Sequence, residues 1–153
     1  MAEQLNEKKQ NEAQEFLRQI ELCDTHISNK LEELDRLNDL ARKITTSLSM
    51  APAHGSGNQD KLGNAVAKIV DLEKEINHEI DHYVDKKTEV KRVLEKIKNP
   101  DQLKVLSKHY LLFETLEQIA CEMGYSYRNI CYIHGRGLQA VAEILKEGAD
   151  NAN

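Results

Sequence analysis

The sequence predicts an all-α fold in which a long antiparallel coiled-coil hairpin precedes a smaller domain of short helices. Charged residues make up 31% of the chain and aromatic residues 5%, and tryptophan is absent. This composition favours helices packed through aliphatic seams over a thick globular core. Two prolines and seven glycines in 153 residues also leave few turns for a β fold.

The first long helix is expected over residues 3–48, which contain neither proline nor glycine. We expect it to be frayed before Phe16. Apolar residues recur seven positions apart along it, and such a repeat predicts a coiled-coil seam. The repeat consists of Ile20, Ile27, Leu34, Ala41 and Leu48, with Leu31, Leu37 and Ile44 on its flanks.

A second long helix is expected from about Ala65 to Lys98, after a flexible connection at about 49–64 that holds one proline and three glycines. Glu73 and Lys87 interrupt its seam and would set the register. The two helices can pair within one chain, between chains, or both ways in a four-helix dimer. The second seam consists of Ile69, Ile76, Tyr83, Val90 and Ile97, completed by Val66, Ile80 and Leu94.

The composition changes after Asn99 and Pro100, which are expected to cap and begin the next helix. Five of the seven aromatic residues lie between positions 110 and 132. We therefore expect a helical hairpin over 1–98, a compact domain over 99–146, and a disordered tail over 147–153.

The segment from Thr115 to Val141 has the layout of a helix-turn-helix, in which the second helix enters the DNA major groove. Thr115 and Gln118 can form a capping box at the start of the first helix. Gly124 follows that helix where a positive φ is needed, and Ser126 can cap the second. The inner faces are expected to consist of Leu116, Ile119, Ala120 and Met123 in the first helix, and Ile130, Ile133, Leu138 and Val141 in the second.

This segment, TLEQIACEMGYSYRNICYIHGRGLQAV, resembles region four of primary bacterial sigma factors without a gap. Over roughly residues 20–145 the chain also resembles small phage and prophage proteins of Gram-positive hosts related to ArpU-type late transcription regulators. That likeness rests on KIVDLEKEIN at 68–77, GYSYR at 124–128 and IHGRGL at 133–138. The resemblance implies a sigma-region-four-like helix-turn-helix in a cytoplasmic, phage-encoded transcription regulator that binds double-stranded DNA.

The sigma-like motif places Tyr127, Arg128, Cys131 and Tyr132 where that family contacts bases. Arg128 is the best candidate for a bidentate contact to guanine, which is worth about 1–3 kcal/mol of discrimination. Tyr125 can instead pack in the small core. The full set of expected DNA-binding residues is Ser126, Tyr127, Arg128, Asn129, Cys131, Tyr132, His134 and Arg136, of which Asn129, His134 and Arg136 would lie toward the backbone or the helix flank.

The charge of this domain argues against strong DNA binding by a single copy. The chain has a formal charge of −5, and residues 101–153 carry 5 basic and 7 acidic side chains. Phosphate neutralisation supplies most non-specific affinity. We therefore expect a homo-oligomer formed through the coiled coil, or help from RNA polymerase. The rival reading is a protein-interaction module that docks on the host transcription machinery without strong DNA binding of its own.

Two segments resemble metal-binding motifs, but both are incomplete. HEIDH at 78–82 matches the H-E-x-x-H zinc motif, but its extended form needs glycine at 85 and histidine at 88, where Asp85 and Thr88 stand. Cys121, Cys131 and His134 lack a paired C-x-x-C and a fourth ligand. We therefore expect no enzymatic activity, no metal and no cofactor.

The sequence also predicts the compartment. Three scattered cysteines are typical of reduced cytoplasmic thiols. The first ten residues lack the apolar core of a signal peptide, and no apolar run approaches the ~18 residues of a membrane span.

Overall fold

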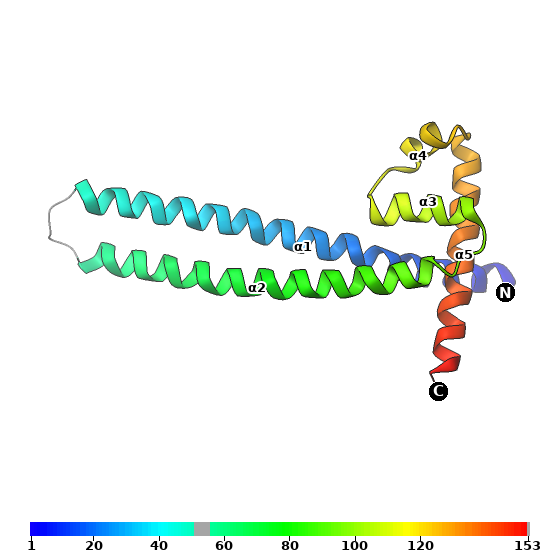
Figure 1. Ribbon diagram of the computed structural model, residues 1–153, viewed down its shortest axis with the longest axis horizontal. Helices are drawn as coiled ribbons and strands as arrows, with labels where there is room; N and C mark the ends of the chain where they lie inside the picture. The colour runs from blue at the N-terminus through cyan, green and yellow to red at the C-terminus, as the bar shows by residue number, and fades with distance from the viewer. Residues whose placement is uncertain (51–55, 153) are drawn as a thin grey trace. The chain divides into compact units, whose positions relative to one another are not determined.

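The computed structural model describes residues 1–50 and 56–152, and every element it contains in those ranges is a helix. The all-α fold expected from the sequence is confirmed. The helices, drawn in Figure 1, are α1 (Ala2–Met50), α2 (Ser56–Leu94), α3 (Pro100–Leu111), α4 (Leu116–Met123) and α5 (Tyr127–Asn151).

The chain forms two compact units, and neither coincides with a domain expected from the sequence. Unit 1 combines Met1–Leu22 with Val84–Asn153, and unit 2 consists of Cys23–Tyr83. The expected boundary at residue 98 therefore differs from the observed one, because both long helices contribute one end to the unit that holds α3, α4 and α5.

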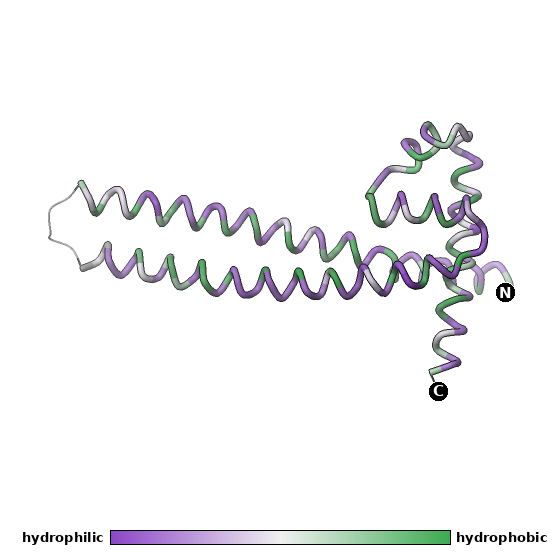
Figure 2. The backbone as a smooth tube through the Cα atoms, in the orientation of Figure 1, coloured by the Kyte–Doolittle hydropathy of each residue, from purple (hydrophilic) through white to green (hydrophobic). Residues whose placement is uncertain are grey.

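Unit 2 is an antiparallel pair of helical segments, one from α1 and one from α2 (Figure 1). The Nζ of Lys30 in α1 lies 3.1 Å from a carboxylate oxygen of Glu75 and 3.5 Å from one of Glu79, both in α2. Hydrophobic residues recur along both helices, as Figure 2 shows.

The inner face of α2 follows most of the expected seam, since Val90, Leu94 and Ile97 are buried and Ile69 and Tyr83 are half-buried. It differs at four positions. Ala65 and Leu72 are buried, together with the expected Ile76, whereas Val66 and Ile80 are exposed.

Of the two residues expected to interrupt the seam, Lys87 is half-buried, whereas Glu73 does not belong to the seam. Glu73 is exposed, whereas Glu79 is half-buried and contacts Lys30. The ion pair between these two helices, and not Glu73, therefore has the position to set their register.

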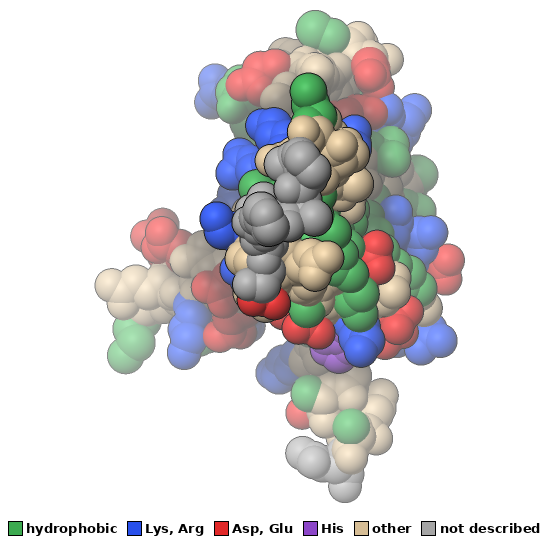
Figure 3. Space-filling model, turned by 90° about the vertical axis from the view of Figure 1, so that its left-hand side faces the viewer, with side chains coloured by type: hydrophobic (Ala, Val, Ile, Leu, Met, Phe, Trp, Pro, Cys, Tyr) green, Lys and Arg blue, Asp and Glu red, His purple; other side chains and the backbone are tan. Residues whose placement is uncertain are grey.

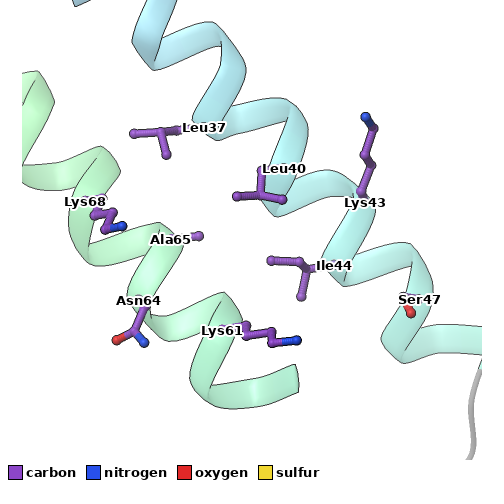
Figure 4. Close-up of a pocket in the computed structure, with 9 residues that line it drawn as sticks. All are labelled: Leu37, Leu40, Lys43, Ile44, Ser47, Lys61, Asn64, Ala65 and Lys68. Carbon is purple, nitrogen blue, oxygen red and sulfur yellow. The ribbon is translucent and has the colours of Figure 1, made fainter. Parts of the chain in front are cut away.

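A groove of about 430 Å³ lies between the two helices of unit 2 (Figure 4). Leu40 and Ile44 point from α1 toward α2 in this view, and Ala65 points back toward α1. Lysine side chains from both helices share the lining with these apolar residues. The lysines are Lys43, Lys61 and Lys68.

The helix ends differ from those expected in three places. The expected connection at 49–64 is helical over 49–50 and 56–64, and its residues 51–55 lie outside the described residues. The second helix ends at Leu94 instead of Lys98. The expected disordered tail over 147–153 is helical as far as Asn151, because α5 continues through it.

The core of unit 1 is built from α3, α4 and α5. The side chain of Asn99 accepts hydrogen bonds from the backbone N–H groups of Asp101 and Gln102, so α3 begins where the sequence predicts. Val105 of α3 packs with residues of the two following helices in one buried cluster. The cluster contains Val105, Ile119, Ala120 and Ile130, and is bordered by Leu116, Met123 and Ile133.

The first turns of α1 belong to this unit and are not frayed. Ala13, Leu17 and Ile20 are each buried. The Gln10 side chain donates a hydrogen bond to the Gly135 carbonyl at 3.5 Å. The Gln139 amide donates to Asn6 at 3.1 Å. The N-terminal segment therefore lies against α5 and covers part of its length.

Two glycines of α5 make a matched pair for substitution. A Cβ added at Gly137 would lie 3.0 Å from Cδ1 and 3.1 Å from Cγ of the buried Leu106, whereas one at Gly135 would meet nothing within 4 Å. We expect Gly135→Ala to stabilise unit 1 by about 1 kcal/mol through helix propensity. Gly137→Val should destabilise it by about 1–3 kcal/mol through overpacking. Denaturant unfolding of the two variants tests this, and equal effects would contradict it.

Candidate nucleic-acid interface

The turn between α4 and α5 is fixed by the capping residues that the sequence predicts. The Thr115 hydroxyl accepts from the Gln118 backbone N–H, and the Gln118 side chain accepts from the Thr115 N–H. Gly124 ends α4 with a φ of 69°, which glycine adopts at little cost. The Ser126 hydroxyl then accepts from the Asn129 N–H and begins α5. These contacts set the direction in which α5 leaves the turn.

A charged cluster holds α4 against the end of α3. Lys108 of α3 contacts Glu122 of α4, and its Nζ lies 3.2 Å from a carboxylate oxygen of Glu114. The hydrogen bond with Glu122, followed by that with Glu114, raises the pKa of Lys108. The intervening Phe113 has a φ of 58°, and His109 Nδ1 donates to the Glu114 carbonyl at 2.7 Å. These contacts hold the backbone turn at Phe113 in its strained conformation.

The outer face of α5 carries a stripe of three residues spaced four apart: Arg128, Tyr132 and Arg136. All three are exposed, whereas Ile130 and Val141 on the opposite side are fully buried. The guanidinium of Arg136 also donates to Gln139 at 3.2 Å. The sequence grouped Arg136 with the helix flank, but in α5 it continues the line of Arg128 and Tyr132.

Tyr127 and Cys131 form a second, separate pair one turn apart. Their hydrogen bond, followed by the charge interactions with Cys131 and Glu117, raises the pKa of the Tyr127 hydroxyl. Tyr127 is exposed and Cys131 is half-buried. The phenol is therefore a neutral hydrogen-bond donor near pH 7, and it lies beside the Arg128 stripe rather than within it.

His134 is turned into unit 1, unlike its exposed neighbours among the expected DNA-binding residues. Its Nε2 lies 2.9 Å from the Tyr110 hydroxyl, and its ring stacks on that of Tyr110 with centroids 5.7 Å apart. Burial, followed by the nearby charges of His109 and Arg18, lowers the pKa of His134 to about 4. Its role in the described structure is to join α5 to α3.

The low pKa of His134 predicts acid sensitivity of unit 1. A folded pKa of about 4 lies below the ordinary value of 6.5, so the unfolded chain binds the proton more readily between these values. We expect the free energy of unfolding to fall as the pH drops from 6.5 toward 4, by on the order of 1–3 kcal/mol for this group. Well above pH 6.5, His134 is neutral in both the folded and the unfolded state, so this loss of stability should be absent.

Denaturant unfolding of the parent and of His134→Gln at a series of pH values measures this effect. Carboxylates that titrate in the same range act on both proteins, so the difference between the two curves isolates the histidine. A difference that does not change between pH 7 and pH 4.5 would contradict the assignment.

Unit 1 has a more favourable charge for nucleic acid than residues 101–153 alone suggest. It carries 14 basic and 15 acidic side chains, because α1, α2 and the residues after α2 bring extra cations. The hydroxyl of Tyr125 donates to Asp101 at 3.1 Å, which ties the start of α3 to the turn before α5. Lys8, Lys9 and Arg18 of α1 are three of the nine added cations, and the other six are Lys86, Lys87, Lys91, Arg92, Lys96 and Lys98.

The other expected residues have simpler positions. Ser126 is exposed, but its hydroxyl is engaged as the helix cap. Asn129 is exposed on the first turn of α5. Tyr125 is partly exposed, so it does not fill the core. Sequence reasoning missed Lys96 and Lys98, although the basic run that ends α2 is visible in the sequence.

The described residues contain no group of three or more side chains that could hold a metal ion. Glu79 of the HEIDH segment contacts Lys30 instead. Cys23 is buried, Cys121 is exposed, and neither of them nor Cys131 forms a disulfide. Among the helices that the structure describes, none is long and apolar enough to cross a membrane.

Comparison of this chain with protein-family models, with curated proteins and with solved structures finds no match. The structure itself shows an all-α protein in which a tight turn joins α4 and α5 of unit 1.

Proposed function

We propose that this chain is a phage-type DNA-binding transcription regulator, related to the ArpU-type regulators, whose helix α5 enters the major groove. The observation that carries the proposal is the exposed stripe of Arg128, Tyr132 and Arg136 on the helix that follows a fully capped turn. A helix that reads base edges needs polar, exposed side chains on one face and a buried opposite face.

The proposal assigns different roles to the residues around this stripe. Arg128 lies in the first turn of α5, where recognition helices contact bases, and its guanidinium can pair with guanine. Tyr127 and Tyr132 can donate to phosphate oxygens or contact thymine methyl groups. Lys96 and Lys98 are exposed just before α3, and the proposal assigns them to contacts with phosphates.

A single copy has too few cations for tight binding. With 14 basic side chains against 15 acidic ones, unit 1 supplies little non-specific attraction at physiological salt. A second copy through the long helices, or contact with RNA polymerase, would supply the remaining affinity. Two copies would require half-sites about one helical turn apart, or a multiple of it.

The second candidate is a module that docks on the transcription machinery without strong DNA binding. Exposed Leu112 and Phe113, in the strained turn before α4, favour it, since large apolar side chains on a rigid turn are typical of protein contacts. In this case α4 and α5 would present a protein-binding face to polymerase.

Selection of bound duplexes from a random pool, followed by mobility measurements at low and physiological salt, tests the proposal. We expect one enriched motif and affinity that falls steeply with salt. The same measurements with added RNA polymerase separate the two candidates. Binding of random and selected duplexes with equal affinity, or retention only through polymerase, would reject direct sequence reading.

A further inference from the structure

The exposed large apolar residues of α2 form one stripe along the helix. Val66, Val70, Ile80 and Val84 are 48%, 43%, 40% and 53% exposed, and they are the only large apolar residues of the described α2 that are so exposed. At 100° per residue all four fall within a narrow arc. The buried seam of α2, which includes Leu72 and Ile76, lies roughly a quarter-turn away.

The intervals between the residues of this stripe are the same from the N-terminal end of α2 as from its C-terminal end. With Glu73 and Asn77 included, its positions are separated by four, three, four, three and four residues, centred on position 75. A second copy of α2 laid antiparallel across that centre would therefore meet matching positions. Val66 would face Val84 of the second copy, and Val70 would face Ile80.

The centre of this pairing is polar and complementary. Glu73 would face Asn77 of the second copy, so that the amide donates to the carboxylate, and the two-fold axis repeats the contact. Both residues are exposed in the single chain. Polar residues at the centre of an apolar seam fix register and orientation at some cost in stability. The same patch of both copies thus forms the interface, with apolar layers on both sides of two polar pairs, as in an isologous contact.

A residue of α1 supports the same two-fold axis. Lys30 contacts Glu75 and Glu79, so the exposed Leu31 beside it lies level with the centre of the stripe. Because α1 and α2 are right-handed and antiparallel, Leu31 falls on the same side of the pair as the stripe. The axis would therefore bring the two copies of Leu31 together. Figure 3 views unit 2 from its end and shows hydrophobic side chains reaching its surface among charged ones.

We propose that α2 associates with α2 of a second copy through the Val66–Val84 stripe, forming an antiparallel four-helix dimer. The stripe extends for about 27 Å at the rise of an α-helix. Apolar side chains on this face lose their contact with water when the second copy binds. The occupant is this same chain, because the stripe complements itself and needs no other sequence.

Mass measurement by light scattering or sedimentation, without DNA, tests the interface. We expect the parent to reach twice the 17.5 kDa chain mass as its concentration is raised. Val70→Glu and Ile80→Lys should each remain monomeric at concentrations where the parent is dimeric. An equimolar mixture of the two variants should recover the dimer, because Glu at 70 then faces Lys at 80 of the other copy.

Leu22→Glu is the matched control, since Leu22 is a similarly exposed apolar residue on α1 outside the stripe. It should keep the parent mass, and helicity measured by circular dichroism should be unchanged in all variants. A parent that stays monomeric at its highest soluble concentration overturns the proposal. Dimers that persist in both single variants, or a mixture that is not rescued, also overturn it. Because no DNA is present, these results are independent of the proposed DNA binding.

Discussion

Replacing Arg128 with alanine is expected to abolish the sequence-selective footprint on DNA while leaving the protein folded. Arg128 is exposed on the first turn of α5, and its removal takes no atom from the buried cluster around Ile130. A lost bidentate contact to guanine costs about 1–3 kcal/mol, or roughly 5- to 150-fold in affinity. The preference for guanine at one position of the selected motif should be lost with it.

The matched variant is Lys98→Ala, which removes a cation proposed to contact phosphate. It should weaken binding to all duplexes by a similar factor and reduce the salt slope by about 1, without changing the motif. Footprinting and repeated duplex selection distinguish the two patterns. If Arg128→Ala leaves the footprint and the motif unchanged, α5 does not read sequence through this residue.

The second large effect is expected from Ile119→Ala, which should destabilise unit 1 by about 2–5 kcal/mol. Ile119 has no exposed surface and packs with Val105, Ala120 and Ile130, so its truncation leaves a cavity where α3, α4 and α5 meet. Such a loss is a large part of the stability of a small domain. DNA binding should fall as well, because the turn before α5 loses its support.

The circular dichroism of tyrosine side chains can report the loss of stability of unit 1, even though the two long helices dominate the helical signal. Four of the five tyrosines belong to unit 1, and only Tyr83 lies in unit 2. Near-ultraviolet circular dichroism should therefore report unit 1, while far-ultraviolet signal remains dominated by α1 and α2. The exposed Leu112 is the control, and Leu112→Ala should change stability by less than about 0.5 kcal/mol. Equal effects of the two variants would show that unit 1 is not packed as described.

Local features of the sequence predicted the ends and inner faces of the short helices. Asn99, Thr115, Gly124 and Ser126 each act on backbone groups within a few residues, so their types and spacing determine the caps. Ile130 is buried where helical periodicity places it. These interactions need no knowledge of distant parts of the chain.

Long-range contacts could not be predicted in the same way. The contact between His134 and Tyr110 could not be predicted, because Tyr110 lies 24 residues earlier in the chain. The expected seam of α2 was wrong for Val66 and Ile80, which are exposed. The observed seam uses the smaller Ala65 and accepts Glu79, because Lys30 on the other helix compensates that charge. Hydrophobicity alone favours Val66 over Ala65.

The contact between Gln10 and Gly135 joins residues 125 positions apart, and it constrains how the protein is made. At synthesis rates of about 5–20 residues per second, roughly 6–25 seconds pass between the emergence of these two residues from the ribosome. During that interval Leu17 and Ile20 lack the α5 part of their unit. Unit 1 is therefore completed only after α5 has been synthesised, and a fragment beginning at residue 99 would lack the segment that covers α5.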